Sequence, residues 1–321
     1  MPGPELTIGV DLGGTKLLAG AVDASGTVLA CERRVISGLP LPDLLAVTVA
    51  AVEKVREAVP ESADAVCGFG IPALMDRRSG DAVRCVHLPL DGVDFGARIG
   101  PSLGVEVTVD NDANCAMLAE WRFGAARGAS HAAMLTLGTG IGGGLILDGR
   151  LYRGALGAAA EMGHAPIDYD GPPCFGGCPG RGCLEALCSG SALARDALAL
   201  ARMLPDSRLG RDLAAGSAIT GERVTELAHE GDPDARGLLW SLGEKLGVGL
   251  AAIAMTLNPE VLIVGGGVMA ADELVLEPAR AELRRRAMDP GRSAGVAAAA
   301  LGPEAGMIGA ALLAAGMDGT A

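Results

Sequence analysis

The loop over residues 161–190 concentrates side chains that bind metals. It reads EMGHAPIDYDGPPCFGGCPGRGCLEALCSG and holds four of the chain's eight cysteines. His164 is followed by Cys174, Cys178 and Cys183, with glycines between the cysteines. One imidazole nitrogen and three thiolates form the tetrahedral ligand set of a closed structural zinc site. The loop therefore predicts a structural Zn²⁺ bound by His164, Cys174, Cys178 and Cys183.

Two glycine-rich turns have the composition of phosphate-binding turns. Each follows a short apolar segment, in DLGGTK at 11–16 and in LGTG at 137–140, and a third glycine run follows VLIV at 261–264. Glycine lets a backbone N–H approach an anion closely, threonine adds a hydroxyl donor and lysine adds positive charge. Each turn alone fits an ordinary hairpin equally well, and neither has the GxxxxGK[ST] pattern of a P-loop. Their recurrence predicts a nucleotide-binding protein. The candidate nucleotide-binding residues are Gly13, Gly14, Thr15, Lys16, Gly138, Thr139, Gly140, Gly265, Gly266 and Gly267.

Asn111 and Asp112 stand where a predicted strand ends and a predicted helix begins. A carboxylate in this place is rigidly held and suits the removal of a proton from a substrate hydroxyl. The Asn111 amide can both donate and accept, which suits a vicinal diol. Aspartate is also a frequent helix N-cap, so the residues alone leave both roles open for Asp112. Asp11 stands at the end of the first predicted strand. The residues alone allow it to be a turn residue whose side chain forms a hydrogen bond with the nearby backbone.

The order of predicted elements shows an internal repeat. LTIGVDLGGTKLLAGAVDASGTVLA and HAAMLTLGTGIGGGLILDGRLYRG both read as strand, glycine turn, strand, short turn and strand. Apolar residues at helical spacing predict helices over 43–58, 113–123, 234–257 and 304–315. Further short apolar runs predict strands over 65–71, 105–109, 261–264 and near 296–301. The pattern predicts an α/β protein of two related domains, each with its own glycine turn.

Composition excludes several classes of protein. The formal net charge is −13, so there is no basic surplus to neutralise nucleic-acid phosphates or an anionic membrane surface. No apolar run reaches the roughly 20 residues of a membrane-spanning helix, and no secretory signal is visible. We therefore expect a cytoplasmic protein, in which clustered cysteines more often bind a metal than form disulfides. Cys31, Cys67, Cys85 and Cys115 have apolar neighbours and are expected to be buried thiols.

Several motifs together resemble the ROK family, which contains sugar kinases and repressors. The resemblance rests on DLGGTK at 11–16, VDNDANCAMLAEW at 109–121, LGTGIGGG at 137–144 and the pattern ExGH…C…C…GCLE…SG in the cysteine loop. These segments occur in the family's order, and the resemblance covers nearly the whole chain. It implies the two-domain actin/hexokinase/Hsp70-like (ribonuclease H-like) fold, with a nucleotide and sugar cleft between the domains.

The resemblance also implies an activity and a set of site residues. It implies a glucokinase-like, ATP-dependent hexose kinase with Asp112 as general base. Glucose is the commonest substrate in the family, so the expected reaction converts glucose to glucose 6-phosphate. Asn111, Asp112, Glu161, His164 and Glu185 would contact the sugar. The two glycine turns would hold the ATP phosphates, Asp11 would lie near Mg²⁺ and its waters, and residues 265–267 would border the adenosine. His164 would be both a zinc ligand and a sugar donor.

The cysteine loop departs from the family pattern. The family's usual CxCGxxGC becomes a longer segment here, because FGG separates Cys174 from Cys178 and Pro179 replaces a common glycine. Cys188 stands where the family usually has alanine, which favours a buried thiol. If Cys174 does not reach the metal, Cys188 is the alternative ligand.

Other departures concern the sugar pocket. Ala73 and Ala160 stand where the family often has glycine, and His87 falls where many relatives have an asparagine near the sugar. None of these changes removes a group that the reaction needs. They leave the preferred hexose open between glucose, fructose, mannose and an N-acetylated amino sugar.

The predicted domain limits follow from the placement of the motifs. Residues 1–112 with 304–321 are expected to form a small N-terminal domain. Residues 113–303 are expected to form a large C-terminal domain that contains the zinc loop 161–190. Hinges are expected near 112–115 and 300–304.

A protein that senses a sugar without turning it over is the main alternative to a kinase. A ROK repressor carries a DNA-binding module before the kinase-like body, and the first phosphate strand begins here by residue 6. The intact glycine turn at 13–16 and Asp112 favour the enzyme. The expected partners are a small-molecule sugar, without nucleic acid or membrane, and further copies of the chain in a homodimer or homotetramer. Polyphosphate remains an alternative to ATP as phosphoryl donor.

Overall fold

The computed structural model describes residues 5–319, which divide into two compact units. The first unit comprises the chain up to His131, Gly144–Ala160 and the chain from Ala300 onward, and the second comprises Ala132–Gly143 and Glu161–Ala299. The predicted boundary at residue 112 differs from this division, which keeps the helix after Asp112 and residues 144–160 in the first unit. The reason is packing, because this helix, α3 (Asp112–Arg122), lies against the last helix, α10 (Ala305–Ala314).

The two large sheets confirm the internal repeat. In each sheet the third strand of the repeat lies at one edge, followed by the second and the first, and then by two later strands. The first sheet has the order β3 (Val28–Val35), β2 (Lys16–Asp23), β1 (Leu6–Leu12), β4 (Cys67–Ile71) and β8 (Val107–Asn111). The second has the order β11 (Arg150–Leu151), β10 (Ile141–Leu147), β9 (Ala132–Leu137), β12 (Val261–Gly265) and β13 (Gly295–Ala298).

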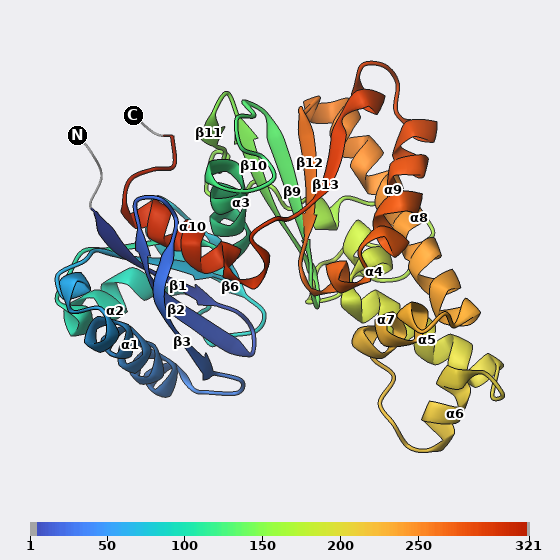
Figure 1. The fold of residues 1–321 in the computed structure, drawn as a ribbon, viewed down its shortest axis with the longest axis horizontal. Helices are drawn as coiled ribbons and strands as arrows, with labels where there is room; N and C mark the ends of the chain where they lie inside the picture. The colour runs from blue at the N-terminus through green and yellow to red at the C-terminus, as the bar shows by residue number, and fades with distance from the viewer. Residues whose placement is uncertain (1–4, 320–321) are drawn as a thin grey trace. The chain divides into compact units, whose positions relative to one another are not determined.

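Helices cover both faces of the first sheet. α1 (Leu41–Ala58) and α2 (Phe95–Leu103) pack on one face, and α3 and α10 pack on the other (Figure 1). β1, β4 and β8 are parallel, so their carboxyl ends lie at the same edge of the sheet. Asp11 and Asn111 therefore come to the same edge, because Asp11 pairs with Gly70 and Ile71 pairs with Asn111.

Close approach of α10 to this sheet depends on glycine. A Cβ added to Gly9 of β1 would lie 1.9 Å from the Met307 carbonyl oxygen, and one added to Gly68 of β4 would lie 1.8 Å from that of Ala310. No side chain fits into such a gap. The glycines thus let the helix backbone rest directly on the strands whose ends carry Asp11 and Asn111, which fixes those ends in a dense core.

The second unit is rich in helices. Its helices are α4 (Leu184–Cys188), α5 (Gly190–Met203), α6 (Arg208–Ala214), α7 (Gly221–His229), α8 (Pro233–Leu257) and α9 (Glu273–Arg286). Within residues 5–319, α8 alone is long and apolar enough to cross a membrane by length and composition. It packs against α4, α5, α7 and α9, and Leu239, Leu246 and Leu250 are fully buried. This helix therefore belongs to the core of its unit.

A small third sheet was not expected from the sequence. Strands β5 (Ala73–Met75), β6 (Asp81–Cys85) and β7 (Val93–Asp94) form it in that order, followed at once by α2. The expected burial of Cys67, Cys85 and Cys115 is confirmed, but Cys31 is exposed. Cys31 lies in the edge strand β3, whose side chains alternate in exposure, so it points away from the core.

Candidate active site

The strand-to-helix junction at residues 111–112 places a carboxylate at a strand end. β8 ends at Asn111 and α3 begins at Asp112. The N-cap is Asn111, whose Oδ1 accepts hydrogen bonds from the backbone N–H of Ala113 (2.9 Å) and of Asn114 (3.1 Å). The Asn111 Nδ2 donates to the Ala73 carbonyl oxygen at 3.3 Å. Because Asn111 caps the helix, Asp112 is not needed for that role, although its Oδ1 also accepts the Ala113 N–H at 2.8 Å.

Two carboxylates near this junction have raised pKa values. Burial, and then the negative charge of Asp112, raises the pKa of Asp11 to about 7. Burial also raises the pKa of Asp112. Hydrogen bonds from backbone N–H groups and the nearby His87 imidazole lower this pKa, but by less. A carboxylate with a raised pKa is a stronger proton acceptor once it is ionised. Two partly buried carboxylates that repel each other also suit a divalent cation, which would relieve the repulsion.

The first glycine turn lies beside these carboxylates in the first unit. The Gly13 N–H donates to the Lys16 carbonyl oxygen at 2.9 Å, which closes the turn between β1 and β2. Thr15 and Lys16 are exposed, and a Cβ on Gly14 would lie 2.9 Å from the Cβ of His87. His87 thus contacts this turn and also interacts electrostatically with Asp112.

The second glycine turn borders a cavity of about 630 Å³ within the second unit. The Gly138 N–H donates to the Gly140 carbonyl oxygen (2.9 Å), and the Gly190 N–H donates to the Gly138 carbonyl oxygen (2.8 Å). Gly267 of the third glycine run also lines the cavity. Sequence reasoning did not find the remaining wall, which the N-terminal end of α5 and the length of α7 supply. The additional lining residues include Ser191, Thr220, Glu222, Thr225, Glu226 and His229. Their only sequence signal was capping, since Ser189 and Thr220 are the N-caps of these helices.

Glu185 connects the second glycine turn to the cysteine loop. Its side chain is buried, and its Oε2 accepts the Ile141 N–H at 2.8 Å. A Cβ on Gly140 would lie 2.4 Å from that oxygen, so the glycine makes room for the carboxylate. The Cys174 thiol donates toward the other oxygen, Oε1, at 3.7 Å. Glu185 therefore contacts both the glycine turn and the cysteine loop.

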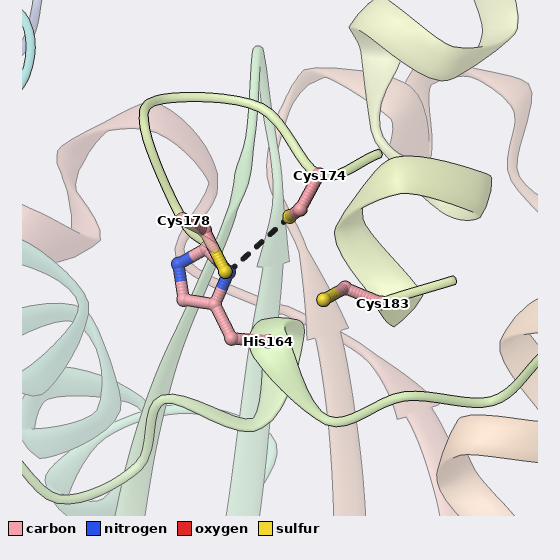
Figure 2. Close-up of side chains that lie close together, drawn as sticks. All are labelled: His164, Cys174, Cys178 and Cys183. Carbon is pink, nitrogen blue, oxygen red and sulfur yellow. Dashed lines mark hydrogen bonds between the residues drawn. The ribbon is translucent and has the colours of Figure 1, made fainter. Parts of the chain in front are cut away.

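His164, Cys174, Cys178 and Cys183 gather at one point of the cysteine loop (Figure 2). Their ligand atoms all lie within 4.8 Å of one another, and the His164 Nδ1 lies 3.5 Å from the Cys174 Sγ. Burial, and then the neighbouring Cys183, raises the pKa of the Cys174 thiol. A bound metal ion would stabilise the thiolate form of these ligands. One nitrogen and three sulfurs at this separation fit a tetrahedral zinc ion.

The loop backbone brings these ligands together. A short 3₁₀ turn, Met162–His164, supplies the histidine, and Cys183 directly precedes α4. Gly182 has φ +58°, and a Cβ there would lie 1.6 Å from the Asp168 carbonyl oxygen, so only glycine fits. The Gly180 N–H donates to the Cys178 Sγ at 3.3 Å, which orients this side chain. Both features are consistent with a metal-binding loop.

Cys188 does not join this cluster. It is buried in α4, where its thiol donates toward the Leu242 carbonyl oxygen at 3.8 Å. Burial raises its pKa, which keeps the thiol protonated. Of the two alternatives for the fourth ligand, the structure places Cys174 in the cluster.

Glu161 and His164 form a partly exposed pair beside the cluster. The Glu161 Oε2 lies 3.7 Å from the His164 Nε2, and 39% of the glutamate side chain and 35% of the histidine side chain are exposed. The His164 Nδ1 faces Cys174, so its Nε2 is the nitrogen on the Glu161 side. This arrangement leaves one imidazole nitrogen for a metal and the other for a carboxylate or a substrate.

Ala160 adopts a strained conformation next to this pair. Its φ is +69°, a left-handed value that costs a residue with a Cβ about 1–2 kcal/mol, and its side chain is buried. We therefore expect Ala160→Gly to raise the free energy of unfolding by about 0.5–1 kcal/mol, after the larger chain entropy of glycine is subtracted. Urea titration of the two proteins measures the difference. A loss of stability of the same size would show that the Ala160 methyl group stabilises more than its backbone strain costs.

Comparison with known proteins identifies relatives along nearly the whole chain. The model of the ROK family matches residues 7–317. A protein named glucokinase from Streptomyces coelicolor is 35% identical over 316 residues, which cover 96% of this chain and 97% of that protein. A xylose repressor from Caldicellulosiruptor bescii is 30% identical over 73% of this chain but only 59% of its own length.

Solved structures agree with this result. The crystal structure of a ROK family glucokinase from Streptomyces griseus, in complex with glucose and AMPPNP, has a TM-score of 0.85 and 36% identity over 96% of this chain and 98% of that chain. A ROK hexokinase from Thermus thermophilus has a TM-score of 0.75 and 32% identity over 96% of this chain and 97% of that chain. The expected two-domain actin/hexokinase-like fold is confirmed. The family model matches residues 7–317, and a relative aligns with this chain along nearly its full length. The two five-stranded sheets are consistent with this match. This chain therefore belongs to the ROK family.

Proposed function

We propose that this protein is an ATP-dependent hexose kinase that phosphorylates glucose to glucose 6-phosphate. The observation that carries the proposal is the likeness over 96% of the chain to a glucokinase structure that holds glucose and AMPPNP. The site residues support it independently, because a carboxylate with a raised pKa directly follows a strand in the unit that also carries the glycine turn 13–16. Phosphoryl transfer requires positioning, charge neutralisation and a proton acceptor, and the chain supplies residues for each.

Asp112 is the general base in this proposal. Its carboxylate accepts the proton of the sugar hydroxyl as that oxygen attacks the terminal phosphorus of ATP, and the bond from this phosphorus to the bridging oxygen breaks to release ADP. The burial that raises its pKa improves its strength as a base, and the backbone N–H of Ala113 holds its Oδ1 in place at 2.8 Å. Asn111 donates to a neighbouring hydroxyl with the amide hydrogen that is not used by Ala73.

Three residues of the second unit complete the proposed sugar site. Glu161, His164 and Glu185 accept from or donate to the remaining hydroxyl groups. Glu185 is held by Ile141 and is therefore rigid, whereas Glu161 and His164 are partly exposed and accessible to a ligand. Hexose epimers differ in the direction of one hydroxyl, so the spacing of these acceptors selects the sugar.

The two glycine turns and the cavity bind the nucleotide in this proposal. The turns at 13–16 and 138–140 provide backbone N–H donors for phosphate oxygens, and Lys16 adds positive charge. The cavity of about 630 Å³ has room for an adenosine, and Gly267 lines it. In this proposal Gly265 and Gly266, which precede Gly267 in the same glycine run, also border the adenosine. Asp11, whose pKa is raised to about 7 by burial and by Asp112, would hold Mg²⁺ and its waters. The metal would neutralise phosphate charge, while the chain's own residues fix the geometry.

We further propose that His164, Cys174, Cys178 and Cys183 bind a structural Zn²⁺. The fit of the donor set and the mutual distance of the ligand atoms support this assignment. Zinc would hold a loop that has few apolar residues to bury, and with it Glu161, His164 and Glu185. We also propose a cytoplasmic homodimer or homotetramer, which analytical ultracentrifugation would test.

A sugar sensor without catalysis is the second candidate function, favoured by the similarity to xylose repressors. A coupled spectrophotometric assay with Mg·ATP or polyphosphate against glucose, fructose, mannose and N-acetylated amino sugars decides between the two. We expect turnover with ATP, fastest with glucose. Calorimetric binding of a sugar without any turnover would identify a sensor and overturn the kinase.

A further inference from the structure

Asp110, Arg153 and Asp318 form a buried charged network in the first unit. Their exposed fractions are 5%, 4% and 7%. The Arg153 Nε donates to the Asp110 Oδ2 at 2.5 Å, and its Nη1 donates to the Asp318 Oδ2 at 2.9 Å. One guanidinium therefore joins two carboxylates that are 208 positions apart in the chain, at residues 110 and 318. Neither the proposed reaction nor the motifs above assign a role to these three residues.

The network reaches the proposed catalytic segment through Asp110. The Asp110 Oδ1 accepts the Asn111 N–H at 2.7 Å and the Asn114 Nδ2–H at 3.0 Å. The residue before Asp112 and a residue one half-turn after it are thus bound to one carboxylate oxygen. Because the other oxygen is held by Arg153, the carboxylate cannot rotate without breaking a charge-assisted bond.

The Asp318 end of the network is anchored independently. The Leu151 N–H donates to the Asp318 carbonyl oxygen at 3.2 Å, and the Arg122 Nη2 donates to the Met317 carbonyl oxygen at 2.8 Å. A Cβ on Gly319 would lie 2.6 Å from the Gly149 carbonyl oxygen. The segment after α10 is therefore packed on β11 and α3, and it can serve as a fixed support.

A network of this kind is costly to build for stability alone. Burying three charged groups removes their hydration, and well-packed apolar residues often replace such groups without loss of stability. What charge-assisted bonds provide is fixed direction, and a general base must be held within a fraction of an ångström. The network includes Asp110, two residues before Asp112, and this placement matches that need.

We infer that Asp318, acting through Arg153 and Asp110, is a positioning residue for the general base Asp112. The inference rests on the proposed kinase function. In this arrangement the C-terminal segment holds the junction between β8 and α3 in the orientation needed for proton transfer. None of the three side chains has to contact the substrate.

The test compares the wild-type protein with Asp318→Asn. Asparagine keeps the shape and one acceptor oxygen but removes the charge that fixes Arg153. We expect kcat for glucose phosphorylation to fall between about 10- and 100-fold, as expected for a displaced catalytic group, with KM for glucose changed less than about twofold. The control is Val52→Ala in the buried face of α1, which lowers thermal stability without touching the network. We expect its kcat to stay unchanged at a temperature where both variants are folded.

A second variant separates positioning from general stability. If Asp318 acts through Asp110, then Asp110→Asn and Asp110→Asn/Asp318→Asn should have the same kcat, because the path is already broken in the single variant. If the reductions of kcat in the two single variants multiply in the double variant, the inference is overturned. An unchanged kcat in Asp318→Asn, with an active wild type, would also overturn it. A wild-type protein that phosphorylates no sugar overturns the proposed function, and this inference with it.

Discussion

Asp112→Asn should lower the turnover number for glucose phosphorylation by about 10²–10⁴-fold, the usual contribution of a positioned general base. The asparagine retains the oxygen that accepts the Ala113 N–H, and Asn111 caps α3 in either protein, so the fold should be preserved. Sugar affinity should change little, because the lost function is proton acceptance. The measurement is kcat in the coupled assay, with the sugar Kd from calorimetry.

Asp94→Asn is the matched control for this change. Asp94 is also an aspartate at the start of a helix in the first unit, and its Oδ1 caps α2 by accepting the Ala97 N–H at 2.9 Å. It has no role in the proposed chemistry, so its variant should retain the wild-type turnover number. Near-normal turnover by Asp112→Asn would remove Asp112 from the role of base.

The second large effect is expected from loss of the metal. The purified protein should contain about one zinc per chain, and Cys174→Ser should reduce the zinc content after dialysis to a small fraction of that value. Because structural zinc contributes folding free energy outright, the variant should also lose several kcal/mol of stability in the second unit. Elemental analysis and thermal melting measure the two effects.

Cys188→Ala provides the comparison for the zinc prediction. It removes a thiol from the same stretch of chain, but one that lies outside the cluster, so the zinc content should remain about one per chain. Loss of zinc from Cys188→Ala with retention in Cys174→Ser would exchange the roles of the two cysteines. A fully active wild-type protein that contains no zinc would contradict the zinc site altogether.

The sequence predicted the repeat because each half carries its own complete local signals. Apolar runs, glycine turns and short hairpin loops are local features, and they predicted the succession of strands along each half of the repeat. The order of the strands within each sheet came from the structure. The third sheet, over residues 73–94, was missed because its strands are short and only partly buried, so β6 lacks a clear alternation. The predicted domain boundary at 112 did not account for packing between α3 and α10, which are nearly 200 residues apart.

The candidate site was predictable where residue type carries the chemistry. Histidine and cysteine spacing indicated the metal cluster, and the glycine turns indicated a nucleotide. Ser191, Thr225 and Glu226 were missed as cavity residues because nothing in their local sequence shows which side of a helix faces a cavity. The network of Asp110, Arg153 and Asp318 was missed for a related reason, since each charge is ordinary until the fold buries it.

Ala160 shows a different limit of sequence reasoning. The departure from the family's glycine was visible, but its cost depends on a backbone angle that composition does not reveal. Asn111 is a similar case. The sequence left open that Asp112 caps the helix, and only the hydrogen bonds show that Asn111 is the N-cap.

The most direct test of the whole account is a ³¹P NMR measurement on the wild-type protein with Mg·ATP and glucose. The account predicts one new phosphate monoester resonance, that of glucose 6-phosphate, which grows in equal amount with ADP and is absent when glucose is omitted. Release of inorganic phosphate in place of the monoester, or unchanged ATP beside bound glucose, would contradict it.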